Sequence, residues 1–159
     1  MVLTNGKQID DFYVTTLADS VHVIAITKEK QVVLIRMYKQ GADDIMIQFP
    51  AGRREDRHKD LLDVAVSELE EETGIEVGRS DLNYLGKLAI MSTKATELAH
   101  YYLVTDVEIN SQQSLDENEE IEVLFLELDE IEKYIAQGKI WDALCIAGWD
   151  LAKKKKGIL

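Results

Sequence analysis

The chain has 159 residues, of which 46% are apolar and 30% are charged, a balance typical of one globular domain spanning residues 1–159. A net charge of −12 and the lack of any apolar run of membrane-spanning length argue against nucleic-acid and membrane partners. Residues 1–11 lack the basic start and apolar centre of a signal peptide, so we expect a cytoplasmic protein. Cys145 is the single cysteine, and we expect it to pack as a small buried hydrophobe.

The first part of the chain is rich in β-branched and aromatic residues, which predicts strands at 12–17, 21–27, 31–38 and 45–49. The polar residues 28–30 are typical of a hairpin turn, and the segment 50–52 ends the fourth strand. The apolar period then becomes helical between Asp60 and Thr73. Asp60 is the expected N-cap and Gly74 the expected C-terminal glycine.

Strand patterns return in the second part of the chain at residues 84–91, 100–107 and 121–126. An acidic loop, residues 116–120, separates the last two of these strands. Helical patterns follow at 129–137 and 141–154. Strands followed by helices, with one helix inserted between strands, predict an α+β fold in which a mixed β-sheet is sandwiched between helices.

Three glutamates share one side of the helix expected at residues 60–73. Glu68 and Glu71 are spaced i,i+3, and Glu68 and Glu72 are spaced i,i+4. Like charges at these spacings cost roughly 0.2–0.5 kcal/mol per pair. The helix dipole disfavours an anion in the last turn by roughly 0.3–1 kcal/mol. Mg²⁺ would reverse both penalties because it binds carboxylate oxygens together with substrate phosphates, but a solvated acidic face has the same pattern.

Residues 52–75 resemble the Nudix box, which is Gly, five residues, Glu, seven residues, then Arg-Glu-aliphatic-x-Glu-Glu-x-Gly-aliphatic. Gly52 matches the opening glycine, and residues 67–75 match the second half except at their first position. The wider chain resembles the ADP-ribose pyrophosphatase branch of Nudix hydrolases. That similarity lies in residues 12–25, 33–36, 49–52, 116–123 and 138–140.

The resemblance implies a Nudix pyrophosphohydrolase that uses Mg²⁺ or Mn²⁺ to cleave a diphosphate bond in a small nucleoside-diphosphate derivative, with an ADP-ribose-like substrate favoured. The implied metal ligands are Glu68, Glu71 and Glu72, and Glu71 is also an implied catalytic residue. An acidic loop supplies the general base in related enzymes, which makes Glu119, Glu117 and Glu120 the candidates here.

The same resemblance implies substrate contacts by Gly52 and by Arg36, for which a surface ion pair is the alternative interpretation. Glu97 is a further metal or base candidate, with surface exposure the simpler interpretation. The branch also implies a homodimer, with N-terminal strands at about residues 8–17 in the interface.

Two box positions differ from the family. The spacing from Gly52 to Glu68 is one residue longer, so the first box glutamate falls at His58 or Lys59, and Ser67 replaces the box arginine. In the family, that glutamate and arginine help to hold the loop against the helix. The alternatives are therefore a catalytically silent Nudix-fold module that binds nucleotide or regulates a partner, and a pyrophosphatase for nucleotide sugars or nucleoside triphosphates.

Overall fold

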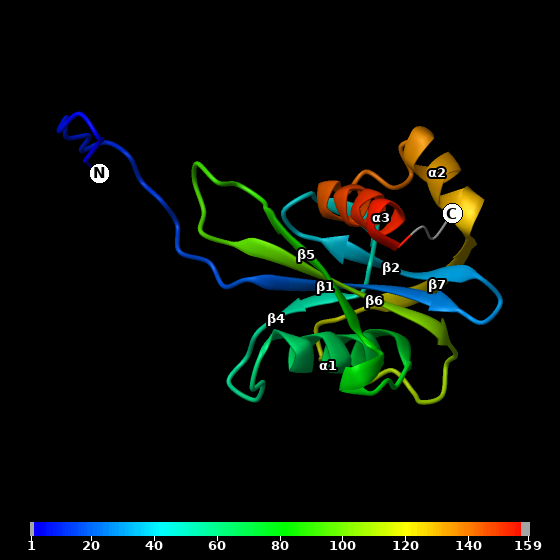
Figure 1. Cartoon of the computed structure of the whole chain (residues 1–159). Coiled ribbons are helices and arrows are strands. Elements are labelled where there is room, and N and C mark those ends of the chain that lie inside the picture. The colour runs from blue at the N-terminus through cyan, green and yellow to red at the C-terminus, as the bar shows by residue number, and fades with distance from the viewer. Residues whose placement is uncertain (1, 157–159) are drawn as a thin grey trace.

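A mixed β-sheet with helices on both faces forms the centre of the computed structural model, which describes residues 2–156 (Figure 1). Its strands are β1 (Ser20–Thr27), β2 (Gln31–Lys39), β3 (Asp44–Gln48), β4 (Ala51–Arg53), β5 (Asn83–Ala89), β6 (Leu98–Val107) and β7 (Ile121–Glu127). The helices are α1 (Leu61–Thr73), α2 (Leu128–Ala136) and α3 (Ala143–Lys156), with a 3₁₀ turn η1 at Arg79–Asp81. The predicted α+β sandwich is confirmed. Among residues 2–156, no helix is both long enough and apolar enough to cross a membrane.

Strand β1 lies at the centre of the sheet, whose order is β3-β2-β1-β6-β5, with β4 paired to β1 and β7 paired to β2. It runs parallel to β6 and antiparallel to β2 and β4. Val21 and Val23 pack in the core shared with α1, whereas Ile24 and Ile26 pack in the core shared with α2 and α3. Because both faces are covered, every residue of β1 is buried, which explains why its central residues Val23 to Ile26 are all apolar.

Helix α1 begins and ends where its sequence signals predict. The Asp60 carboxylate accepts hydrogen bonds from the backbone N–H of Leu62 and Asp63, at 2.9 and 3.0 Å, as an N-cap does. Gly74 adopts a left-handed conformation, with φ of 72°, that ends the helix. The apolar side of α1, which includes Val64, Ala65 and Leu69, is buried against the sheet. This packing fixes the rotation of the helix and hence the direction of its glutamates.

Helix α3 contains Gly148 because the helix lies very close to β6. A Cβ at position 148 would lie 2.4 Å from Cε1 of the fully buried Tyr101 ring. Cys145 is buried on the same helix, and burial raises the pKa of its thiol. The prediction that this cysteine packs as a small hydrophobe is therefore confirmed.

The strand predicted at residues 12–17 is wrong. Residues 2–19 instead form an arm that leads away from the sheet (Figure 1), held by the isolated bridge between Thr15 and Ala95 and by hydrogen bonds to residues 94 and 96. The apolar side chains of this arm, Phe12, Tyr13, Val14 and Leu17, are exposed. Its β-forming composition does not produce a strand because that composition reflects packing on a neighbouring strand, and the segment beside it, residues 94–96, forms a single bridge and no strand.

Candidate active site

Helix α1 presents Glu68 to strand β4, where Gly52 leaves room for the carboxylate. A Cβ at position 52 would lie 2.0 Å from Glu68 Cδ, so any other residue would displace this group. The short β4 strand was not predicted, because a proline precedes it and a glycine lies within it. Its pairing with β1 brings Gly52 opposite Val21 and so holds the glycine against α1.

Glu72, one turn further along α1, is buried and reaches the same strand. Its Oε2 accepts a hydrogen bond of 2.8 Å from the backbone N–H of Ala51. Burial raises the pKa of Glu72 to about 8, the Ala51 hydrogen bond opposes this rise, and the charge of Glu68 adds to it. Burial and the neighbouring Glu71 raise the pKa of Glu68 to about 7. The site thus holds two carboxylates whose negative charge the surrounding protein does not fully compensate.

The third box carboxylate, Glu71, is held by an arginine. Arg57 Nη1 and Nη2 donate to Glu71 Oε1 and Oε2 at 2.6 and 2.9 Å, and Arg57 Nε donates to Glu55 Oε2 at 2.8 Å. Across the described residues, no three Asp, Glu, His or Cys side chains are grouped closely enough to hold a metal ion. The structure therefore brings Glu68 and Glu72 together at β4 and directs Glu71 toward Arg57.

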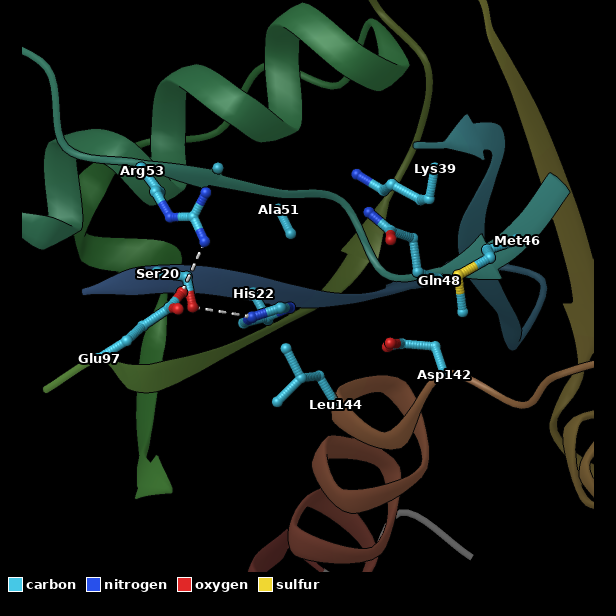
Figure 2. Close-up of a pocket in the computed structure, with 11 residues that line it drawn as sticks. Ser20, His22, Lys39, Met46, Gln48, Ala51, Arg53, Glu97, Asp142 and Leu144 are labelled. Atoms are coloured by element: carbon cyan, nitrogen blue, oxygen red, sulfur yellow. Dashed lines mark hydrogen bonds and ion pairs between the residues drawn. The ribbon is translucent and has the colours of Figure 1, made fainter. Parts of the chain in front are cut away.

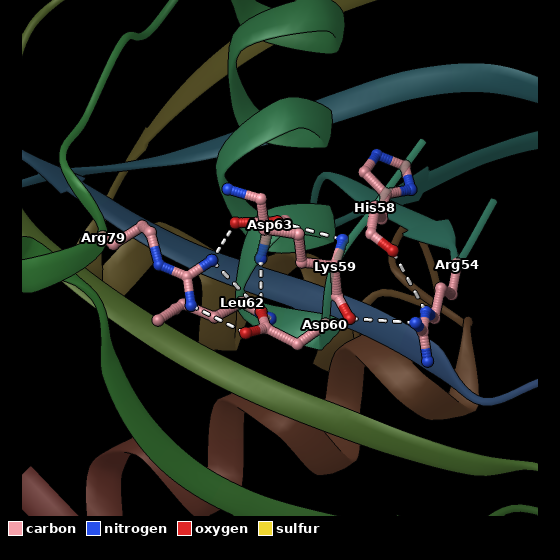
Figure 3. Close-up of polar contacts among 7 residues, drawn as sticks. All are labelled: Arg54, His58, Lys59, Asp60, Leu62, Asp63 and Arg79. Atoms are coloured by element: carbon pink, nitrogen blue, oxygen red, sulfur yellow. Dashed lines mark hydrogen bonds and ion pairs between the residues drawn. The ribbon is translucent and has the colours of Figure 1, made fainter. Parts of the chain in front are cut away.

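The loop before α1 is held by contacts that differ from those of the family box. Arg54 Nη2 donates to the Lys59 carbonyl at 2.9 Å and Arg54 Nε donates to the His58 carbonyl at 3.3 Å (Figure 3). His58 is buried, and its Nδ1 accepts from the Glu55 N–H at 3.1 Å. The loop consequently closes through its own contacts, without the box glutamate. Ser67, which stands where the box has an arginine, is half-buried.

The beginning of α1 has its own arginine. Arg79, from η1, donates to Asp60 at 2.7 Å and also pairs with Asp63, whose other oxygen accepts from the Lys59 N–H at 3.0 Å (Figure 3). Sequence reasoning missed the roles of Arg54, Arg57 and Arg79. The density of basic residues in 53–59, within so acidic a chain, was the available signal for the first two.

A cavity of about 240 Å³ opens beside β4 (Figure 2). Arg53 and Glu97 lie on one side of it, joined by an ion pair of 3.0 Å, and Lys39 and Asp142 lie on the other side. The remaining lining residues are Ser20, His22, Met46, Gln48, Ala51, Gly52 and Leu144. Because Gly52 both lines this cavity and contacts Glu68, the cavity and the carboxylates form one continuous site.

Burial shifts the pKa of two further cavity groups. His22 stacks on Tyr101, and burial, followed by the charges of Lys39 and Arg53, lowers the His22 pKa to about 4, so its ring is neutral at neutral pH. Burial also raises the pKa of Asp142.

Glu97 is 8% exposed, so the simpler expectation of a surface position for this residue is wrong. Its position just before β6 brings it to Arg53, with which it forms the ion pair, and no local pattern indicated this contact.

The acidic loop, residues 116–120, is exposed, and Glu117, Glu119 and Glu120 all lie on its surface. After burial, the charge of Glu119 is a smaller contribution to the raised pKa of Glu68 and Glu72. Arg36 pairs with Glu122 across β2 and β7 and lines a separate cavity of about 330 Å³ with Glu120, Ile121, Glu122 and three residues of β2 and β3. The structure shows the surface ion pair, and the substrate contact of Arg36 stays a prediction.

The order of these features along the chain, with Gly52 on a short strand opposite Glu68 and Glu72 on the following helix, matches a known domain. The NUDIX domain family model matches residues 16–145. The chain belongs to the Nudix family. The predicted family resemblance is therefore confirmed.

Three curated relatives carry different descriptions. A methanol dehydrogenase activator of Bacillus methanolicus is 33% identical over 125 residues, which cover 78% of this chain and 66% of that protein. An ADP-ribose pyrophosphatase of Bacillus subtilis (strain 168) is 27% identical over 128 residues, with coverage of 78% and 66%. A putative nudix hydrolase 2 of Caenorhabditis elegans is 29% identical over 127 residues, with coverage of 74% and 56%. The chain thus spans less than two thirds of the length of each of these relatives, and little more than half of the third.

The fold has close counterparts among solved structures. The crystal structure of an ADP compounds hydrolase superposes with a TM-score of 0.75 over 89% of this chain and 75% of the other, at 22% sequence identity. At this level of identity the similarity establishes a shared Nudix fold.

Proposed function

We propose that this Nudix protein is a pyrophosphohydrolase that uses Mg²⁺ or Mn²⁺ to cleave a diphosphate bond in a nucleoside-diphosphate derivative. The observation that carries the proposal is a pair of carboxylates, the partly buried Glu68 and the buried Glu72, placed against Gly52 and Ala51 beside a polar cavity. Withdrawing two neighbouring carboxylates from water is costly unless a cation binds them, and hard oxygen donors suit these metals. The description of the Bacillus subtilis relative as an ADP-ribose pyrophosphatase agrees with this chemistry.

The carboxylates of α1 are the residues that would bind the metal ion. Glu68 and Glu72 would hold the cation, and Glu71 would join them when it leaves Arg57. When bound, the cation neutralises the diphosphate and lowers the pKa of a water molecule. The Ala51 N–H orients Glu72, and Gly52 admits Glu68 to the substrate cavity.

Glu119 is our candidate for the general base, because it is the loop carboxylate whose charge reaches the site. A base must come within hydrogen-bond reach of the attacking water, which a substrate-bound loop can provide. Glu117 is the second candidate, from the same exposed loop.

The cavity chemistry favours a substrate that carries both phosphate and sugar hydroxyls, as ADP-ribose does. Lys39 and Arg53 supply cations for phosphate oxygens, and Asp142 and Gln48 supply acceptors for hydroxyl groups. A cavity of about 240 Å³ accommodates one half of such a molecule, with the diphosphate placed at Gly52 next to the carboxylates.

The test is hydrolysis of a panel of ADP-ribose, nucleotide sugars, dinucleotides and nucleoside triphosphates with Mg²⁺ or Mn²⁺. We expect ADP-ribose or a close relative to give a nucleoside monophosphate and a sugar phosphate. Glu68→Gln should abolish this turnover, whereas Glu70→Gln, which changes a different side of the same helix, should preserve it. Equal turnover in the Glu68 and Glu70 variants would contradict the proposal.

A second candidate is a Nudix-fold module that binds nucleotide without cleaving it and acts on another protein. The engagement of Glu71 by Arg57 favours it, as does a 33% identical relative described as a methanol dehydrogenase activator. Binding of nucleotide by calorimetry, with no cleavage of any compound in the panel, would favour this module over the hydrolase.

We also propose a homodimer in which the arm containing Phe12, Tyr13, Val14 and Leu17 lies on a partner subunit. These apolar side chains are exposed on the isolated chain, as expected of an interface segment. Light scattering should give twice the chain mass at micromolar concentration, and removal of residues 1–17 should give monomers. A monomeric mass for the whole chain would refute this assembly.

A further inference from the structure

Arg57 occupies both oxygens of Glu71 with its planar guanidinium. The two bonds, 2.6 and 2.9 Å, have the bidentate geometry that makes arginine–carboxylate pairs strong. Glu71 belongs to the three carboxylates that the family box assigns to the metal, and Arg57 lies on the loop before α1. One ligand of the proposed metal site is thus already bound to a cation that belongs to the protein.

We propose that Arg57 is a tethered cation that competes with the divalent metal for Glu71, so that metal binding releases the loop of residues 54–59 from α1. This inference rests on the metal site of the proposed function. A metal ion and a bidentate guanidinium compete for the lone pairs of the same two oxygens, and their like charges repel each other at that distance. Each event therefore opposes the other, and the loop position and the metal occupancy are thermodynamically linked.

The loop's own contacts are separate from the Arg57–Glu71 pair. They are those of Arg54 with the His58 and Lys59 carbonyls and of His58 with Glu55, and none of them involves Glu71. The Arg57 pair is therefore what joins the loop to the last turns of α1, and its loss should loosen the loop. The loop's connection to α1 through Asp63 lies at the opposite end of the helix from Glu71, near the loop's own junction with it.

Glu55 provides a place for the released guanidinium. It already accepts a bond of 2.8 Å from Arg57 Nε and lies on the same loop. After the exchange Arg57 keeps one carboxylate partner, which limits the free-energy cost of opening. The Arg57 side chain is also about half exposed, at 49%, so its outward path is not blocked by core packing.

The competition has a measurable size. An exposed ion pair contributes little to binding on its own, and bidentate geometry with a half-buried carboxylate adds to this. Removing the competitor should therefore tighten metal binding by roughly three- to tenfold, since tenfold corresponds to about 1.4 kcal/mol.

Mn²⁺ titration of the whole chain, followed by electron paramagnetic resonance of free Mn²⁺, tests this directly. Arg57→Gln should lower the Mn²⁺ dissociation constant by roughly three- to tenfold. The matched control is Lys59→Gln, which removes the same charge from the same loop at an exposed position and should change the constant by less than about twofold. Equal effects of both variants would show a general field effect and overturn the proposal.

A double-mutant cycle with Glu71→Gln isolates the contact. In the Glu71→Gln background, Arg57→Gln should no longer tighten Mn²⁺ binding, because the competed ligand is gone. Undiminished tightening in that background would refute direct competition. Weaker binding in Arg57→Gln alone would also refute it, since Arg57 would then support the site.

Hydrogen exchange supplies a readout of the loop that does not depend on affinity. Mg²⁺ should increase exchange of the backbone amides of residues 54–59 in the wild type but not in Arg57→Gln, whose loop is already released. Unchanged or decreased exchange in the wild type would contradict loop release. Absence of Mn²⁺ binding in both proteins would overturn the metal site itself, whereas equal, measurable binding would overturn only the role of Arg57.

Discussion

Replacing Glu72 by glutamine should stabilise the metal-free protein at alkaline pH. The glutamine oxygen can still accept the Ala51 hydrogen bond, so the substitution removes the ionisable group and little else. Burial raises the Glu72 pKa from 4.5 to about 8, which means that the folded protein holds this proton over a pH range in which the unfolded chain has lost it.

The sign and size of the effect follow from this shift. The proton's contribution to stability is complete below pH 4.5, declines as the pH rises, and is lost once the pH passes about 8. Each pKa unit corresponds to about 1.4 kcal/mol, so the full shift sets an upper limit of roughly 4–5 kcal/mol. Relaxation around a buried charge and water penetration reduce such penalties, and we expect Glu72→Gln to add about 1–3 kcal/mol at pH 8 and almost nothing at pH 5.

Urea unfolding in EDTA, followed by circular dichroism between pH 5 and pH 8, measures this difference. Glu70→Gln is the control, because it removes a carboxylate from the same turn of α1 on another side. Saturating Mg²⁺ should stabilise the wild type more than Glu72→Gln, since a ligand stabilises only the state that binds it. A wild-type-to-variant difference that stays constant across this pH range would refute the reasoning.

Substitutions at three further positions test the close packing at Gly52 and Gly148 and the N-cap at Asp60. Gly52→Ala should push Glu68 aside and weaken Mn²⁺ binding by calorimetry roughly tenfold with little change in Tm, because the displaced group is the end of a flexible side chain; unaltered affinity would count against the placement. Gly148→Ala should lower the free energy of unfolding in urea by roughly 1–3 kcal/mol, because its methyl group meets the rigid Tyr101 ring; a neutral result would show that α3 can shift. Asp60→Ala should cost about 1 kcal/mol by the same measurement whereas Asp60→Asn should cost less, since only the second retains the N-cap acceptor; equal costs would assign the loss to the Arg79 ion pair instead.

The elements of the fold that local signals define could be predicted from the sequence. Helix α1 was predicted to within one residue because an N-cap at Asp60 and a left-handed glycine at 74 are encoded next to the helix itself. The arm at residues 12–17 was predicted wrongly because β-propensity describes a side chain's fit to a neighbouring strand. Whether that neighbour exists is a property of the whole fold.

The candidate site divides in the same way. The shared side of Glu68, Glu71 and Glu72 follows from helical geometry, and the structure keeps Glu68 and Glu72 together at β4. The capture of Glu71 by Arg57 joins residues 14 positions apart across a loop whose shape no local pattern specifies. The cavity could not be predicted from the sequence. Its lining residues Lys39 and Asp142 are far apart in the chain and come together only when α3 packs against the sheet that contains β2.

The parallel pairing of β1 with β6 has a consequence for synthesis of the chain. Residues 20–27 pair with residues 99–107, so one side of the central strand has no partner until about 80 further residues have been made. During that interval an apolar strand, buried along its whole length in the finished protein, presents free backbone groups to the cell. Long-range pairing of this kind slows folding and favours aggregation of intermediates. Ribosome-bound chains that end before β6 should therefore be the species that most need a chaperone.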